Sequence, residues 1–92
     1  MSPFLSIIVP FHDSAEKCGP LLGVLREIAP EDDVELIFVD DGSTDSSVAV
    51  VREFEAGAKC PVIIVDRVNG GPGAARNSGL DRASGQWVWF VD

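Results

Sequence analysis

Cationic side chains are scarce in this sequence. It has 7 lysine and arginine residues against 15 aspartate and glutamate residues, which gives a formal net charge of −8. Nucleic acids and anionic membrane surfaces both reward clustered lysine and arginine, so this balance argues against either as a partner. An acidic chain can still bind a phosphorylated ligand, but backbone amides, a helix N-terminus or a metal ion must then supply the positive field.

Cysteine and long apolar runs are also scarce. Cys18 and Cys60 match no metal-ligand spacing and lie in apolar stretches, which predicts buried thiols in a reducing compartment. The apolar run within residues 1–11 is far too short to cross a bilayer, and it lacks the basic region of a signal peptide. We therefore expect a cytoplasmic protein with no membrane segment in this chain.

Hydrophobic residues are plentiful, at 46% of the 92 positions, and they gather in short runs. A chain of this length makes one small domain that buries roughly 60–65% of its unfolded surface. Four runs rich in apolar residues read as strands, at 5–9, 36–39, 62–65 and 86–91. The segments between them read as helices, from about 17–19 to 29, at 44–55 and at 74–83. This alternation predicts a three-layer α/β/α domain over residues 1–92, with a Rossmann-like parallel sheet of about four strands in the order 3-2-1-4.

The chain is organised around residues 36–45, Leu-Ile-Phe-Val-Asp-Asp-Gly-Ser-Thr-Asp. The apolar run predicts a strand buried on both faces, and Asp40 and Asp41 follow at its carboxyl end, where ligands bind in open α/β sheets. Ser43 or Thr44 is placed to cap the next helix. A single aspartate can simply form an Asx turn, but two adjacent carboxylates repel each other unless donors or a cation engage them. We interpret the pair as part of a site.

The predicted sheet order brings other polar groups to the same edge. His12 and Asp13 follow the first strand, which Pro10 is expected to end; the glycine-rich residues 69–73 follow the third; and Asp92 follows the fourth. Arg76 lies in the first turn of the third helix, where it and the N–H groups of that turn would meet a phosphate. Singly, the histidine and the arginine are more ordinary as surface groups. Their shared location indicates a site.

Three other modules share parts of this pattern. The segment Gly71–Arg76 followed by Asp92 resembles a dinucleotide-binding fingerprint, but Arg76 replaces the third glycine, which serves close helix–strand packing. A receiver module would use the aspartate pair for Mg²⁺, yet it needs a lysine after a late strand, and no lysine follows Lys59. A non-catalytic module that assembles through an exposed sheet edge is the third alternative.

Together these residues resemble the N-terminal half of a family-2 glycosyltransferase, an enzyme of the GT-A fold that uses a nucleotide-sugar donor. The matching stretches are Ser6–Pro10, Val39–Asp45, Asn69–Leu80, Ser84–Gly85 and Trp89–Asp92. They span nearly the whole chain, and they are specific in combination although none is specific alone.

The resemblance implies a nucleotide site made of six residues, namely Pro10, His12, Asp13, Asp40, Asp41 and Arg76. Asp41 would accept a hydrogen bond from the uracil N–H of a UDP-sugar, with Asp40 supporting the turn. Arg76 would lie near the diphosphate. His12 and Asp13 stand where the family usually has a tyrosine against the base and an asparagine.

The resemblance also implies a divalent cation and a reaction. Asp92 matches the first aspartate of the family's Asp-x-Asp motif, whose carboxylates hold Mg²⁺ or Mn²⁺ on the diphosphate. The reaction would be inverting transfer of the sugar to an acceptor hydroxyl. The second aspartate, the acceptor site and the general base are expected beyond residue 92, so no catalytic residue is assigned here and the fragment alone is expected to be inactive.

The segment 86–91 carries an expectation about assembly. Trp87 and Trp89 share one face of this predicted strand and Val88 and Phe90 share the other, with no charge or proline to discourage pairing. In the family's fold this strand is interior. We therefore expect a two-fold homodimer through the exposed edge strand 86–91.

Overall fold

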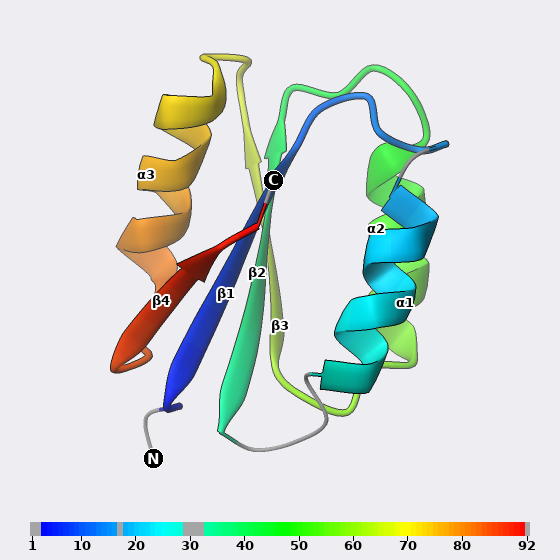
Figure 1. Cartoon of the computed structure of the whole chain (residues 1–92). Coiled ribbons are helices and arrows are strands. Elements are labelled where there is room, and N and C mark those ends of the chain that lie inside the picture. Colours follow the sequence, from blue (N-terminus) through cyan, green and yellow to red (C-terminus); the bar gives the residue numbers. More distant parts are fainter. Residues whose placement is uncertain (1–2, 17, 29–32, 92) are drawn as a thin grey trace.

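The computed structural model describes residues 3–16, 18–28 and 33–91. Strands and helices alternate along the chain (Figure 1) as β1 Leu5–Phe11, α1 Cys18–Ile28, β2 Val34–Asp41, α2 Ser47–Ala56, β3 Val62–Arg67, α3 Pro72–Arg82 and β4 Trp87–Phe90. The predicted order of strands and helices is therefore confirmed. The predicted end of the first helix at Ala29 and the predicted metal ligand Asp92 lie outside the described residues.

The sheet has the predicted topology. All its strand pairs are parallel, and the strand order is β3-β2-β1-β4. β2 lies inside the sheet and every one of its residues is buried, as its unbroken apolar run predicts. Phe11 pairs in register with Asp40, so the carboxyl ends of β1 and β2 lie side by side.

The two faces of the sheet are covered by different helices. Figure 1 shows α1 and α2 on one side and α3 on the other. The larger core lies on the α1 and α2 side and includes Ile7, Val9, Phe11, Leu25, Leu36, Phe38, Val51 and Phe54. Within it the rings of Phe38 and Phe54 meet edge to face with their centroids 5.7 Å apart. Burying each large side chain of this kind contributes about 1.5–3 kcal/mol.

On the opposite face, α3 approaches the sheet through small residues. Ala75 and Gly79 are buried there, one turn apart. A Cβ atom at Gly79 would overlap Cγ2 of Ile8 and lie 3.3 Å from Cγ2 of Val39. Close helix–strand packing therefore occurs at Gly79, while Arg76 is only half-buried. This supports the objection to the dinucleotide fingerprint, which needs its small residue at Arg76.

A buried carboxylate ties the loop before β4 to the amino end of the sheet. Glu35 is 5% exposed and accepts hydrogen bonds from Ser6 Oγ (2.5 Å) and from the Ser84 N–H (2.7 Å). Ser6 Oγ in turn accepts from the Gly85 N–H (2.8 Å). A Cβ atom at Gly85 would lie 2.6 Å from Ser6 Oγ and 2.7 Å from Ser6 N, so this approach requires glycine. Burial raises the pKa of Glu35, but the hydrogen bonds from Ser6, Ser84 and Gly85 outweigh it, and the pKa lies below its ordinary value.

The first strand does not end at Pro10 as predicted but continues to Phe11. Ile8 accepts a hydrogen bond at its C=O from the Val91 N–H (2.9 Å), just past β4. Pro10 is two residues further along, so its backbone nitrogen points the same way, past the last β1–β4 pair. The missing N–H therefore removes no ladder bond to β2.

Several other boundaries shift by one to three residues, whereas β1 and β3 begin at Leu5 and Val62 as predicted. α2 begins at Ser47, three residues after the predicted Thr44, and its N-cap is Ser46, whose side chain makes no capping bond. Neither Ser43 nor Thr44 is therefore a cap, because both are engaged by Asp13, as described below. α3 begins earlier than predicted, with Pro72 in its first turn, where the missing N–H costs nothing.

The burial of the two cysteines and the bounds of β4 can also be compared with the predictions. Cys60 is buried, Cys18 is half-buried, and both are free thiols, so burial was predicted correctly for Cys60 and only partly for Cys18. The strand predicted at 86–91 is Trp87–Phe90, and all four of its side chains are exposed. Across the described ranges, every helix is too short or too polar to span a membrane.

Candidate functional site

A cavity of about 530 Å³ opens at the carboxyl ends of β1 and β2, beside the start of α3. It is lined by Pro10, Phe11, His12, Ser14, Asp41, Asn69, Gly71, Pro72, Ala75 and Arg76. Four of the six residues assigned from the sequence to the nucleotide, namely Pro10, His12, Asp41 and Arg76, lie among them. The edge of the sheet chosen from the strand order is thus where the structure brings these side chains together.

The carboxylate of Asp41 holds the loop of residues 69–73, which we call the glycine loop. Oδ1 accepts the Gly70 N–H (2.9 Å) and Oδ2 accepts the Gly71 N–H (3.0 Å). Nε of Arg67 lies 3.2 Å from Oδ1. The Gly70 hydrogen bond is the main cause of a lowered Asp41 pKa; the Gly71 bond and the charges of Arg67 and His12 add to it, and together they outweigh the burial that raises it. Asp41 is therefore a carboxylate at neutral pH.

Two glycines allow the glycine loop to approach the end of β2. Gly71 has φ of +93°, a conformation that L side chains rarely adopt. Gly42, just after Asp41, has φ of +73°, and a Cβ atom on it would lie 2.8 Å from the backbone nitrogen of Asn69. Gly42 and Gly71 therefore allow the glycine loop to lie close to the end of β2.

Asp40 has a different role from its neighbour. It points to the other face of the sheet, is buried, and accepts the Ser43 N–H at Oδ1 (2.9 Å). This bond spans three residues, one more than an Asx turn, but it gives one aspartate of the pair the turn-forming role that the sequence left open. Asp40 supports the turn after β2 and does not line the cavity.

His12 forms one wall of the cavity. Its Nδ1 lies 2.8 Å from the backbone oxygen of Asp41, and its Nε2 lies 3.3 Å from Oδ2 of Asp13. The amide of Asn69 also donates to the Asp41 backbone oxygen (3.1 Å). These contacts fix the imidazole between the ends of β1 and β2 while leaving its side chain 46% exposed.

Asp13 joins the loop after β1 to the loop after β2. Its φ is +45°, and its Oδ1 accepts the N–H groups of Thr44 (2.6 Å) and Asp45 (3.2 Å). Its own N–H donates to Ser43 Oγ (2.9 Å). Asp13 therefore frames the site from outside the cavity, and it uses the residues that the sequence assigned to a helix cap.

Arg76 and the first turn of α3 form the opposite wall. Gly71, Pro72, Ala75 and Arg76 all line the cavity, so the positive end of the helix borders it. First-turn N–H groups have no partner within a helix and bind anions readily. This supplies the positive field that an acidic chain needs for a phosphorylated ligand.

A metal site is not formed by the described residues alone. Residues 3–16, 18–28 and 33–91 contain no group of three or more histidine, cysteine, aspartate or glutamate side chains that could hold an ion. Asp92, the predicted ligand, lies outside them.

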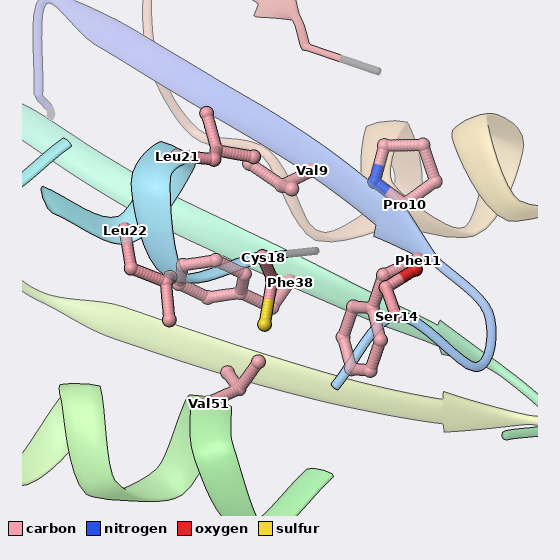
Figure 2. Close-up of a pocket in the computed structure, with 9 residues that line it drawn as sticks. All are labelled: Val9, Pro10, Phe11, Ser14, Cys18, Leu21, Leu22, Phe38 and Val51. Carbon is pink, nitrogen blue, oxygen red and sulfur yellow. The ribbon is translucent and has the colours of Figure 1, made fainter. Parts of the chain in front are cut away.

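A second cavity, of about 280 Å³, lies on the other face of the sheet. Figure 2 shows its lining residues, which come from β1, the loop after it, β2, α1 and α2 and are mostly apolar: Val9, Pro10, Phe11, Ser14, Cys18, Leu21, Leu22, Phe38 and Val51. Apart from the hydroxyl of Ser14 and the thiol of Cys18 it offers no polar side chain. The first cavity is therefore the candidate site.

Sequence reasoning missed Arg67, and it brought Asn69 to this edge only as part of residues 69–73, without a role of its own. Arg67 ends β3 and contacts Asp41, and Asn69 lies on the cavity wall. The available signal was position, because Arg67 ends the third strand, Asn69 follows it, and β3 pairs beside β2. The contact of Arg67 with Asp41 depends on a long side chain that extends from one strand end to the next, and such a contact leaves no pattern in the sequence.

Comparison with known proteins identifies the class. The family model of Glycosyl transferase family 2 matches residues 6–92, and the chain belongs to this family. A poly(ribitol-phosphate) beta-glucosyltransferase of Bacillus spizizenii is 37% identical over 90 residues, which is 96% of this chain and 14% of that protein. The chain spans 14%, 36% and 15% of the length of three curated relatives.

Solved structures agree. TarS 1–349 of S. aureus in complex with UDP-GlcNAc superposes with a TM-score of 0.79 at 34% identity, over 97% of this chain and 26% of that solved chain. The mannosyltransferase PcManGT of Pyrobaculum calidifontis, in complex with GDP-Man and Mn²⁺, gives 0.74 at 28% identity, over 96% and 26%. The sheet is the corresponding part of a GT-A fold, as the sequence resemblance implied. Membership of this family excludes the alternative interpretations as a receiver module or a dinucleotide-binding module.

Proposed function

We propose that this chain is the donor-binding part of a glycosyltransferase and that its cavity binds the UDP portion of a UDP-sugar. The observation that carries the proposal is the joint placement of Asp41, His12, Arg76 and the α3 N-terminus around one cavity. TarS, which matches along 97% of this chain, has been solved with UDP and with UDP-GlcNAc.

Asp41 is the proposed acceptor for the uracil N–H. A carboxylate has about four lone-pair positions, and the Gly70, Gly71 and Arg67 contacts use three of them. The remaining capacity lies on Oδ2, which among the described residues accepts the Gly71 N–H. His12 would lie against the base, with Pro10 beside it, while Asp13 and Asp40 would act indirectly by fixing the surrounding loops.

The diphosphate is proposed to lie between Arg76 and the first turn of α3. A bidentate guanidinium and a helix N-terminus are both suited to phosphate oxygens. We propose that Asp92 contributes to a Mg²⁺ or Mn²⁺ site there. Such a cation would neutralise the departing diphosphate, and because a single carboxylate does not make a site, its other ligands would be phosphate oxygens and groups outside this chain.

The reaction proposed for the whole protein is inverting transfer of a sugar to an acceptor hydroxyl. This chain spans a minor part of its relatives, so the proposal assigns it donor binding and leaves the general base outside it. We also propose a cytoplasmic location, which two free thiols favour over an oxidising compartment.

Calorimetric titration of UDP against Asp41→Asn tests the assignment. The variant keeps the size of the side chain but loses a charged acceptor, so UDP should bind about ten-fold more weakly. Asp66→Asn removes the same charge from an exposed position of β3 and should bind UDP as the wild type does.

The base gives a second readout. Cytosine carries an acceptor where uracil carries its N–H, so the wild type should prefer UDP to CDP, and Asp41→Asn should lose that preference. Equal UDP affinity in the wild type and in Asp41→Asn would remove Asp41 from the site.

A further inference from the structure

Arg67, the last residue of β3, contacts both the end of β2 and the start of α3 without lining the cavity of the candidate site. Its Nε lies 3.2 Å from Oδ1 of Asp41, at the end of β2. Its Nη1 donates to the Ala74 backbone oxygen (2.9 Å) and to Ser78 Oγ (2.6 Å), in the first two turns of α3. One guanidinium therefore links the strand that carries the proposed base acceptor to the helix that carries the proposed phosphate ligand.

The glycine loop leaves room for this guanidinium. A Cβ atom at Gly70 would lie 2.6 Å from Nη2 of Arg67 and 3.3 Å from Cβ of Ala74. Gly70 is not among the glycines with positive φ, so its backbone conformation is open to alanine. A side chain at residue 70 would therefore have to displace Nη2 of Arg67.

We propose that Arg67 is a positioning residue for the donor site. It holds Asp41 and the first turns of α3 in a fixed relation, so that the base acceptor and the phosphate-binding helix end meet one nucleotide together. The inference rests on the proposed function for its effect on UDP, while the bridge itself can be tested without any ligand.

The pKa of Asp41 can be used to test the contact with Arg67, because the charged groups around Asp41 are known. Arg67 from β3 and His12 after β1 face it, and Arg76 from α3 lines the same cavity. Removing the positive charge of Arg67 takes away one of the causes that lower the Asp41 pKa. The acid titration of Asp41 must then move to higher pH.

The ligand-free test uses the amide resonances of Gly70 and Gly71. Both N–H groups donate to Asp41, so their proton shifts should follow its titration as the pH is lowered. In Arg67→Met the midpoint should rise, and in Arg67→Lys it should return toward the wild-type value because the charge is restored. Arg52→Met, on an exposed position of α2, should leave it unchanged. A loss of fold stability alone would not move this midpoint.

The second test is a double-mutant cycle on UDP affinity. Arg67→Ala and Gly70→Ala should each weaken UDP binding by about ten-fold, since neighbours that share a contact couple by amounts of this order. In the Arg67→Ala background, Gly70→Ala should cost little, because the atom it displaces is gone. Additive losses would show that Gly70 acts independently of Arg67.

The outcomes separate the two proposals. If the wild type binds UDP and Arg67→Met binds it equally well with an unchanged Gly70 and Gly71 titration, the positioning role is refuted. If the wild type does not bind UDP but the amide midpoint shifts as expected, the bridge stands and the donor-binding proposal fails.

Discussion

Glu35 and Asp41 are two buried carboxylates on the same strand, at opposite ends of the sheet. Both have a lowered pKa because hydrogen bonds outweigh burial, yet their partners differ. Glu35 accepts hydrogen bonds from Ser6 and Ser84, and it does not line the cavity of the candidate site. Asp41 holds the loop that lines the cavity. Glu35 is accordingly expected to affect stability and Asp41 affinity.

Glu35→Gln should destabilise the fold by about 1–2 kcal/mol at neutral pH, because Ser6 and Ser84 lose a charged acceptor. The folded pKa of Glu35 lies below its ordinary value of 4.5, so its contribution is present above that pH and is lost as the pH falls through the folded pKa. Urea denaturation of the wild type at descending pH should show this loss, and Glu35→Gln should lack that part of it.

The matched control is Glu53→Gln on the exposed side of α2. It should change the free energy of unfolding by less than about 0.5 kcal/mol. A wild-type acid profile that Glu35→Gln reproduces in full would contradict the assigned role of Glu35.

At the level of elements, α3 depends on a small residue facing the sheet. Gly79→Ala would place a methyl group against Ile8 and Val39, and overpacking of this kind costs about 1–3 kcal/mol. Gly73→Ala is the control in the same helix, because a Cβ atom there meets nothing within 4 Å. It should be neutral or stabilise the helix by up to about 1 kcal/mol.

Thermal or urea unfolding of the two variants distinguishes packing from helix propensity. Both substitutions replace a helical glycine with alanine, so propensity alone would stabilise both. Opposite signs are expected, and a stabilised Gly79→Ala would show that α3 can retreat from the sheet at no cost.

The sequence predicted whole elements well and the joins between them less well. The run from Leu36 to Val39 could be read as a buried strand because burial on both faces demands unbroken apolar residues. The start of α2 was misplaced because Thr44 looks like a cap locally, and only the fold brings Asp13 to its N–H. Arg67 was missed for the same reason. Contacts between loops that are distant in sequence leave no local pattern.

At the level of the whole molecule, β4 is an edge strand of the sheet that the described residues form. Trp87 is 64% exposed and Trp89 48%, on the same face of the strand, and β4 pairs on one side with β1. We propose that, for this chain on its own, a second copy occupies the other side, through antiparallel pairing of the two β4 strands. Continuous, uncharged, apolar strand edges favour this kind of pairing.

Sedimentation at rising protein concentration should show a dimer. Trp89→Lys should shift the equilibrium to the monomer, while Val68→Lys, at an 87% exposed loop position, should leave it unchanged. A wild-type mass equal to the monomer at high concentration would rule out this assembly.

The pairing of β1 with β4 also has a consequence for the order of events during synthesis. Leu5, near the start of the chain, pairs with Trp87, near its end, whereas β2 and β3 follow β1 in sequence and complete the other side of the sheet. A ribosome releases a protein from its N-terminus, so the second side of β1 stays unpaired until β4 has been made, after β2 and β3. Until then the newly made protein presents Ser6, Ile7 and Ile8 along an open strand edge, at the centre of what becomes its sheet.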